Sequence, residues 1–296
     1  MRHVPVLLKE SLEQLDPQNG DFVVDGTLGD GGHAREIIKI IMPKGFFLGT
    51  DLDEEILERT SEEIQRTFYE WKGRMAFVNE NYRNLKNILK KYKFEKADKV
   101  FLDLGFSSMH IEERGKGFSF LKDEPLDMRY SKDNHVSATD VVNNFSEKDL
   151  ADIIYKYGEE RNSRRIAKAI CEERRREKIT NSLRLAQIIA SVARFKGGRT
   201  HPATKSFQAI RIFVNGEFDN LGEFIKDLPE IIKKNGRVAI ISYHSLEDRI
   251  VKNGFREFLK NGIAKAINKK PIAPSRYEIK NNPRSRSAKL RVIEFV

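Results

Sequence analysis

FVVDGTLGDGGH, at residues 22–33, is the most informative segment of this chain. It starts with Phe22, Val23 and Val24, the aromatic and β-branched types found in buried parallel strands, and continues into a glycine cluster. Glycines permit positive φ angles and let a ligand approach the backbone closely. The next segment, AREIIKIIM at 34–42, has the apolar spacing of an amphipathic helix. We therefore expect a strand, a tight turn and a helix N-terminus, whose free N–H groups favour an anionic or carboxylate-bearing ligand.

The spacing of the glycines separates the nucleotide-like ligands that this turn could hold. A P-loop carries Lys and then Ser or Thr directly after its last glycine. Here Gly26 and Gly31 have the P-loop separation, but Gly32 and His33 follow. The sequence therefore argues against ATP and GTP as ligands of this turn.

A dinucleotide and S-adenosylmethionine remain, together with the alternative that the glycines only form a turn. Gly29, Gly31 and Ala34 satisfy the dinucleotide pattern G-x-G-x-x-G/A, and Asp51 follows at the end of another apolar run, as recognition of a ribose requires. S-adenosylmethionine is favoured by Asp25 in the strand end, by a second strand downstream that ends on an acid, and by the lack of a nicotinamide-domain signature. We expect S-adenosylmethionine as the cofactor.

Strand-like and helix-like segments alternate along residues 20–108. Two of the expected buried strands end on acids, at Asp51 and at Asp103. Such alternation predicts βαβ units, a parallel sheet and ligand binding at the carboxyl ends of the strands. After a loop-like stretch, only helical patterns follow up to about residue 215.

The α/β pattern then resumes. A helix is expected from about residue 218 until Asn235-Gly236 ends it, and a buried strand is expected at 237–243. A closing strand at 289–296 is expected to pair antiparallel with one near 263–267.

The predicted fold is an α/β, Rossmann-like sheet domain at residues 1–114 and 216–296, interrupted by an all-helical, basic insertion at 115–215. At 296 residues the chain is long enough for this arrangement, and 39% apolar residues supply its core. No run approaches the roughly eighteen apolar residues of a membrane span, and the N-terminus has no signal-peptide centre, so we expect a cytoplasmic protein. The one cysteine, Cys171, excludes an internal disulfide and a cysteine-based zinc cluster.

Basic residues are concentrated in the predicted insertion. Between Lys156 and Arg211 there are fifteen Lys or Arg against five Glu, a difference equal to the net charge of +10 of the whole chain. Charged helix faces usually only meet solvent, but such a concentration in one segment indicates nucleic-acid binding. Arg174, Arg175 and Arg176 form its densest run and are predicted to contact the nucleic acid.

With these segments assembled, the chain resembles the RsmH (MraW) family of 16S ribosomal RNA cytosine N(4)-methyltransferases. The resemblance covers nearly the whole chain and rests on several long strings in one order, which are far more specific than a glycine motif. The strings are HVPVLLKE (3–10), DGTLGDGGH (25–33), LDLGFSS (102–108), GFSF and PLDMR (117–129), YGEER (157–161), HPATKSFQAIRIFVN (201–215), ISYHSLEDRIVK (241–252) and NPRSRSAKLR (282–291).

The resemblance implies a bacterial, cytoplasmic enzyme with a class I methyltransferase fold and a helical insertion. Such an enzyme uses S-adenosylmethionine to methylate the exocyclic amine, N(4), of a decoding-centre cytosine in the 16S rRNA of the small ribosomal subunit.

By motif position, the resemblance also implies a set of cofactor-binding residues. They are Gly31, Gly32, His33, Asp51, Tyr82, Asp103 and His110. The first motif would meet the methionine end of the cofactor, Asp51 the ribose hydroxyls and Tyr82 the adenine. Asp103 and His110 would line the remaining edge. His110 stands where the family usually has glutamine, and both side chains can donate a hydrogen bond.

The segment from Asp103 to Phe106 is the predicted catalytic site. A cytosine amine is a poor nucleophile because its lone pair is delocalised into the ring. Asp103 or the carbonyl of Leu104 could accept the hydrogens of the amine and direct its lone pair toward the methyl group. Phe106 could stack on a base turned out of its neighbours. The alternatives are that Asp103 caps the loop or faces the cofactor, and that Phe106 belongs to the core.

His201, Asn215 and His244 lie inside strings of the family and are further candidates for contact with the RNA. For each of the two histidines the alternative is a cap or a core hydrogen bond. The sequence has no HExxH or comparable ligand spacing, so no catalytic metal is predicted.

Two other classes of protein remain open. An NAD-dependent dehydrogenase would bind NAD tightly and would need no basic insertion. An RNA-binding assembly factor with a vestigial cofactor site would bind RNA without transferring a methyl group.

Overall fold

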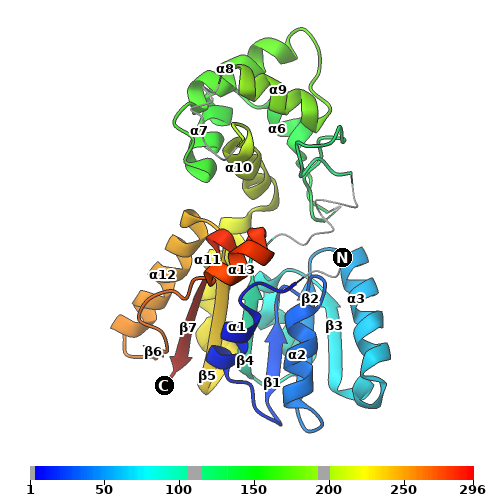
Figure 1. The fold of residues 1–296 in the computed structure, drawn as a ribbon, viewed down its shortest axis with the longest axis vertical. Helices are drawn as coiled ribbons and strands as arrows, with labels where there is room; N and C mark the ends of the chain where they lie inside the picture. Colours follow the sequence, from blue (N-terminus) through cyan, green and yellow to red (C-terminus); the bar gives the residue numbers. More distant parts are fainter. Residues whose placement is uncertain (1–3, 106–114, 132, 193–200) are drawn as a thin grey trace. The chain divides into compact units, whose positions relative to one another are not determined.

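The computed structural model describes residues 4–105, 115–131, 133–192 and 201–296. The chain divides into two compact units. The sheet unit consists of Met1–Gly105 and Phe218–Val296, and the helical unit consists of Phe106–Glu217. Both are shown in Figure 1, and each is described by itself.

The sheet unit is built on one seven-stranded sheet with the order β3-β2-β1-β4-β5-β7-β6. The strands are β1 (Phe22–Asp25), β2 (Phe46–Asp51), β3 (Met75–Asn79), β4 (Ala97–Asp103), β5 (Ile232–Ser242), β6 (Ala264–Ala266) and β7 (Lys289–Phe295). Strands β1 to β5 are parallel to one another, whereas β7 is antiparallel to both β5 and β6. The α/β, Rossmann-like fold predicted from the sequence is confirmed, including the antiparallel closing strand.

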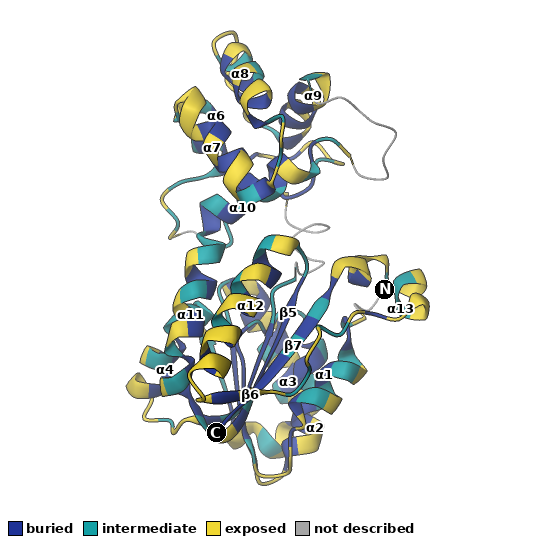
Figure 2. Cartoon of the chain, turned by 90° about the vertical axis from the view of Figure 1, so that its left-hand side faces the viewer, coloured by how far each residue is buried: buried dark blue, intermediate teal, exposed yellow. Residues whose placement is uncertain are grey.

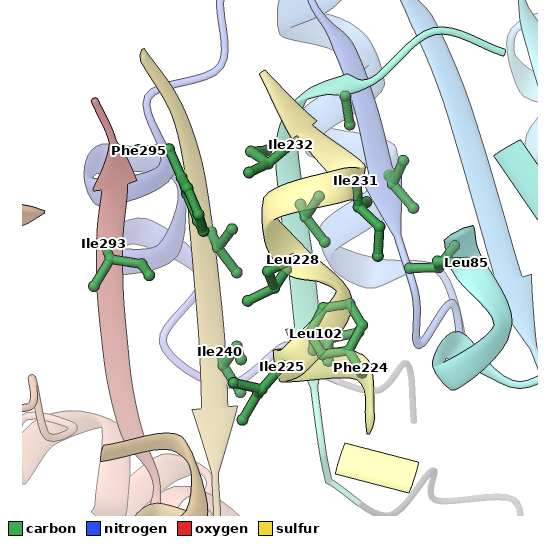
Figure 3. Packing of buried hydrophobic residues seen from close by; sticks show 14 of the residues in the cluster. Leu85, Leu102, Phe224, Ile225, Leu228, Ile231, Ile232, Ile240, Ile293 and Phe295 are labelled. Carbon is green, nitrogen blue, oxygen red and sulfur yellow. The ribbon is translucent and has the colours of Figure 1, made fainter. Parts of the chain in front are cut away.

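Helices cover both faces of this sheet because each has one apolar stripe to bury. The helices are α1 (Leu8–Leu15), α2 (Gly32–Ile41), α3 (Glu54–Thr67), α4 (Leu85–Lys91), α11 (Glu217–Ile231), α12 (Ser245–Lys260) and α13 (Arg276–Asn281). One cluster joins the sheet to α4, α11 and α12 through side chains such as Leu85, Phe224 and Phe255. Figure 3 shows part of it, with Phe224 and Leu228 of α11 facing Leu102 and Ile240 of the strands.

A second cluster fills the opposite face of the sheet. It joins α1, α2 and α3 to the strands through Leu15, Ile37, Ile38 and Ile64. Figure 2 shows the result, with buried strands between helices whose outer faces are exposed. The sheet unit therefore has three layers, and its ligand-binding edge is set by the ends of the parallel strands.

The helical unit has its own core. Its helices are α6 (Ala138–Asn144), α7 (Glu147–Gly158), α8 (Ser163–Arg174), α9 (Ser182–Val192) and α10 (Thr204–Asn215). They share one apolar cluster, to which Val141, Ile154, Ile166, Ile189 and Phe207 each contribute from a different helix. The unit thus buries the apolar stripes that the sequence left without partners.

One predicted boundary is wrong. The helix expected to end at Asn235-Gly236 ends at Ile231, and Asn235 and Gly236 lie inside β5. Asn235 has φ 63°, and a Cβ on Gly236 would lie 2.7 Å from Ile232 Cγ1. The pair forms an irregularity where the register of β5 against β4 shifts, so the Asn-Gly signal marks a bulge in a strand rather than a helix C-terminus.

Candidate active site

Three carboxylates mark the carboxyl ends of neighbouring strands. Asp25 ends β1, Asp51 ends β2 and Asp103 ends β4, and β1 lies between the other two strands. The strand order reverses between β1 and β4. Open parallel sheets bind their ligands at such a switch point, so this edge is the candidate active site.

The glycine turn lies directly after β1, and close contacts explain why several of its positions are glycine. A Cβ on Gly26 would collide with the Leu102 side chain and would lie 3.0 Å from Tyr82 Cβ. Gly31, the N-cap of α2, has φ 70° and offers no side-chain cap. A Cβ on Gly32 would collide with Pro5. Gly31 thus provides no side chain to cap the first N–H groups of α2, and such a helix N-terminus favours an anionic ligand.

Asp51 organises the turn from the end of β2. Its Oδ2 accepts a hydrogen bond from the N–H of Gly29 at 2.8 Å, and its Oδ1 accepts one from the N–H of Asp53 at 2.9 Å. A carboxylate offers about four lone-pair positions, so Asp51 can accept more than these two hydrogen bonds. The predicted role of accepting ribose hydroxyls is thus compatible with the hydrogen bonds that Asp51 already makes.

Tyr82 begins the short 3-10 helix η2 (Tyr82–Asn84) after β3. Its ring is half-buried and lies edge-on to Phe224, with centroids 5.6 Å apart, while its Cβ borders Gly26. Tyr82 therefore belongs to the wall beside the glycine turn, where an adenine is predicted to lie.

Asp103 is held firmly at the end of β4. Its N–H donates to Thr27 Oγ1 at 2.7 Å, and its Oδ1 accepts from the N–H of Gly105 at 3.1 Å. Its Oδ2 lies 3.8 Å from His33 Nδ1. The carboxylate is half-buried and faces several polar groups, so its orientation is set by the fold.

His33 is buried beneath the turn, with 7% of its surface exposed. Its Nε2 lies 3.0 Å from the carbonyl oxygen of Val6, to which it donates, because a carbonyl can only accept. Its ring packs against Phe101, with centroids 4.6 Å apart. His33 thus connects the N-terminal segment to the end of β4, and its ring is engaged inside the protein.

Asp25 is the most buried of the three acids, with 1% of its surface exposed. Burial raises the pKa of its carboxyl to about 7, and the negative charges of Asp103 and Asp51 add to the rise, although the N–H of Thr27 opposes it. A proton on Asp25 therefore relieves repulsion among the three acids near neutral pH.

Tyr243, which sequence reasoning did not single out, belongs to this site. It follows β5 directly, next to the end of β4. A Cβ on Gly105 would lie 2.7 Å from Tyr243 Cε2 and 3.0 Å from Asp103 Oδ1, so only glycine leaves room for both groups. Burial raises the pKa of Tyr243, and the charge of Asp103 and its hydrogen-bonding contact with the phenol raise it further. The phenol therefore stays protonated and acts as a donor toward Asp103. The sequence feature that could have pointed to Tyr243 is its place directly after a predicted buried strand, which is where parallel sheets carry their ligand-binding residues.

The predicted substrate residues of the helical unit have several kinds of environment. Arg174 donates to the carbonyl oxygen of Val142 at 2.8 Å, and Arg176 pairs with Glu173 at 2.9 Å. Arg175 is exposed. Arg175 and Arg176 are therefore the exposed members of this run, with Arg176 paired to Glu173.

His201 and Asn215 are engaged inside the helical unit. His201 stacks on Phe120 with centroids 4.6 Å apart, and its Nδ1 accepts from the N–H of Ala203. Asn215 is 6% exposed and donates to the carbonyls of Met128 and Arg211. Both side chains order the backbone around α10.

His244 is the N-cap of α12. Its Nδ1 accepts from the N–H of Glu247 at 3.3 Å, and its Nε2 lies 2.9 Å from Glu247 Oε1 without hydrogen-bond geometry. The cap that was the alternative to RNA contact is thus present. Phe106 and His110, also predicted as site residues, lie outside the described residues.

The described parts of the chain contain no group of three or more His, Cys, Asp or Glu side chains that could hold a metal ion. Within the same residues, no helix is long and apolar enough to cross a membrane.

A doubly wound sheet of this order, with a glycine turn after β1 and acids closing β1, β2 and β4, defines a class I S-adenosylmethionine-dependent methyltransferase. The chain belongs to the MraW methylase family, whose model matches residues 1–296. This membership confirms the family and the S-adenosylmethionine cofactor predicted from the sequence, and it excludes the dehydrogenase alternative.

Similar proteins cover the whole chain. The chain is 44% identical to ribosomal RNA small subunit methyltransferase H of Dictyoglomus thermophilum over 293 residues, which is 99% of this chain and 96% of the relative. It is 43% identical to the protein of that name from Syntrophus aciditrophicus, with 99% and 98% covered, and 42% identical to the one from Clostridioides difficile, with 99% of each covered. A putative rRNA-methylase from Clostridium thermocellum aligns with 99% of this chain and 100% of its own, at 12% identity and a TM-score of 0.46. A likeness of that size adds nothing to the fold, which the strand order defines by itself.

Proposed function

We propose that this protein transfers a methyl group from S-adenosylmethionine to the exocyclic amine, N(4), of a decoding-centre cytosine in 16S rRNA, within the small ribosomal subunit. The observation that carries the proposal is the Asp103 carboxylate, which is fixed beside the glycine turn at the end of β4. The names of the similar proteins support ribosomal RNA as the substrate. The cytoplasm is then the expected location.

The residues at the strand ends fit the cofactor. The uncapped N-terminus of α2 after Gly31 and Gly32 offers N–H groups to the cofactor's carboxylate. The Asp51 carboxylate, at the end of β2, would accept from the ribose hydroxyls, and Tyr82 lies beside the turn where the adenine would pack. His33 supports this pocket from beneath by holding Val6.

Asp103 is proposed to act on the substrate amine. Its carboxylate can accept an N–H of the cytosine, which draws the nitrogen toward a tetrahedral geometry and aims its lone pair at the methyl group. The N–H of Gly105 and the phenol of Tyr243 orient the carboxylate, while Thr27 Oγ1 accepts from the backbone N–H of Asp103. The contribution is one of positioning and electrostatics, and Phe106 is proposed to stack on the base.

The helical unit is proposed to bind the RNA. Arg164, Arg165 and Lys168 on α8 and Arg175 just after it are exposed, in line with the basic excess of its sequence. Phosphate contacts of this kind supply affinity that depends on salt and not on sequence.

The proposal is tested by transfer of a radiolabelled methyl group from S-adenosylmethionine to purified small ribosomal subunits, to large subunits and to naked 16S rRNA. We expect label in the 16S rRNA of the small subunits and no label in the large subunits. The naked 16S rRNA shows whether the enzyme needs the assembled subunit. An assembly factor with a vestigial site would bind the RNA but leave it unlabelled, and that result would overturn the proposal.

A further inference from the structure

A second basic surface lies in the sheet unit, outside the helical unit. We call residues 269–286 the basic strip; it contains α13 and the 3-10 helix η3 (Pro283–Ser287). Its exposed cations are Lys269, Lys270, Arg276, Lys280, Arg284 and Arg286, and its one acid is Glu278. Outside this part of the chain and the segment from Lys156 to Arg211, acidic residues outnumber basic ones.

The basic strip lies at the same edge of the sheet as the candidate active site. Lys289, the first residue of β7, pairs with Ser242 at the carboxyl end of β5, so the strip arrives at that end of the sheet. In Figure 1, α13 (red) lies at this end. Glu278 Oε1 accepts from the N–H of Leu7 at 2.8 Å, and Asn282 donates to the carbonyl of Val4 at 3.0 Å. In the same N-terminal segment, the carbonyl oxygen of Val6 accepts a hydrogen bond from His33, whose ring also lies beside Asp103. A chain of contacts therefore joins the strip to Asp103.

Three cations of the strip differ from those of β7 in their ion pairing. Lys289 and Arg291 share Asp248 as an ion-pair partner, so their charge is partly neutralised within the fold. Arg276, Lys280 and Arg286 are exposed and form no ion pair with any residue that the structure describes. The single acid, Glu278, is half-buried and turned to the backbone of Leu7. The strip therefore presents unneutralised positive charge to solvent.

Tyr277 lies among these cations with 80% of its surface exposed. It follows Arg276 directly and lies three residues before Lys280, which is the spacing of neighbours on one helix face. An exposed aromatic ring beside free cations matches the needs of a single-stranded nucleic acid, whose bases stack on rings while its phosphates pair with Lys and Arg.

We infer that the basic strip binds single-stranded RNA next to the target nucleotide, with Tyr277 stacked on a base and Arg276, Lys280 and Arg286 at phosphates. This inference rests on the proposed function, since it names a second surface of the same enzyme for the same RNA. A strip beside the active site holds the nucleotides next to the target, whereas contacts in the helical unit are proposed to supply general affinity.

The test measures binding of a fluorescein-labelled, twelve-nucleotide single-stranded RNA with a central cytosine, and methyl transfer to small subunits. Tyr277→Ala is expected to weaken binding about fivefold or more, and Tyr277→Phe, which keeps the ring, to restore it. The triple variant Arg276→Ala, Lys280→Ala and Arg286→Ala is expected to reduce the slope of log K against log salt by about 2, from three lost phosphate contacts.

Matched controls remove the same groups elsewhere on the sheet unit. Lys252→Ala, Arg256→Ala and Lys260→Ala delete three exposed cations from α12, and Tyr69→Ala removes another exposed tyrosine. Both controls should bind the RNA like the wild type. Cofactor affinity and thermal unfolding should be unchanged in every variant, because all these positions are exposed.

Equal loss of binding in the α12 control would show a non-specific charge effect and overturn the inference. Normal binding of the oligonucleotide by Tyr277→Ala and by the triple variant, with a loss of transfer on whole subunits alone, would point to a protein contact and also overturn it. In both cases the proposed function would still hold if the wild-type protein transfers a methyl group to small subunits. If the wild-type protein transfers no methyl group, the proposed function is overturned, and the binding assays still test whether the basic strip binds RNA.

Discussion

His33 Nδ1 lies 3.8 Å from Asp103 Oδ2, while Nε2 of the same ring lies 3.0 Å from the carbonyl oxygen of Val6. One imidazole thus connects the proposed catalytic carboxylate to the N-terminal segment. Glu278 holds the same segment from the other side by accepting from the N–H of Leu7. The orientation of Asp103 therefore depends on residues far from it in the sequence, and it is maintained by the whole edge of the sheet.

Tyr243→Phe should lower kcat of methyl transfer by about tenfold with little change in KM for the cofactor. The phenol is a protonated donor toward Asp103, and one hydrogen bond to a charged group is worth about 1.5 kcal/mol or more. Steady-state kinetics check this split, with Tyr69→Phe, at an exposed ring, as the control. A kcat within a factor of about two of the wild type would show that Tyr243 only fills space.

Asp51→Ala should weaken S-adenosylmethionine binding at least about tenfold, because each charge-assisted hydrogen bond to a ribose hydroxyl is worth about 1.5–3 kcal/mol. Isothermal titration calorimetry measures the affinity. Asp51→Asn is the matched control for the turn, since one amide oxygen can still accept from the N–H of Gly29 or Asp53. Unchanged affinity in the alanine variant would remove this strand end from the cofactor site.

Asp25→Asn should change how stability depends on pH. The pKa of Asp25 is raised from 3.8 to about 7, so the folded protein holds this proton more tightly than the unfolded chain. The stability that the proton contributes is fully present below about pH 4 and is lost as pH rises to about 7. Relative to the wild type, the asparagine variant should therefore gain about 2 kcal/mol between about pH 5 and pH 8.

Denaturant unfolding of both proteins at the two pH values checks this difference. Glu62→Gln, at an exposed position of α3, is the control and should follow the wild type. If Asp25→Asn also follows the wild type, the buried carboxyl does not titrate in this range.

Charge reversal on the helical unit should flatten the salt dependence of RNA binding. The structure favours Arg164→Glu, Arg165→Glu and Arg175→Glu, since these residues are exposed whereas Arg174 supports the carbonyl of Val142. Loss of three phosphate contacts should reduce the slope of log K against log salt by about 2 to 3. Binding assays between low and moderate salt measure the slope. The matched control is Lys252→Glu, Arg256→Glu and Lys260→Glu on α12. Normal methylation by the variant at residues 164, 165 and 175 would show that these cations only contact solvent and do not bind the RNA.

Much of the fold could be predicted because the local signals agree with it. The β-branched and aromatic runs that end at Asp51 and Asp103 become β2 and β4, and the isoleucine stripe after Gly32 becomes α2. The Asn235-Gly236 pair misled because a bulge in a strand and a helix end both need positive φ. The sequence alone does not show whether such a pair ends a helix or forms a bulge in a strand.

The position of the glycine turn was predictable because the backbone there tolerates only glycine, as at Gly26 and Gly31. The contacts of the polar side chains were harder to predict. His33 and Asn215 stand in recognisable strings, yet their polar atoms are engaged by backbone groups that only the fold brings near. Tyr243 was overlooked because its proximity to Asp103 depends on the pairing of β4 with β5, two strands far apart in the chain. Contacts across such a distance leave no local pattern.

The most direct test of the central claim is nucleoside analysis of 16S rRNA after reaction of small subunits with the protein and S-adenosylmethionine. Mass spectrometry of the digested RNA should find one new nucleoside, N(4)-methylcytidine, at a decoding-centre position with the wild type and none with Asp103→Asn at saturating cofactor. Near-normal turnover by Asp103→Asn would show that its carboxylate is not the acceptor for the amine. A methyl group on another atom or another base would contradict the account as a whole.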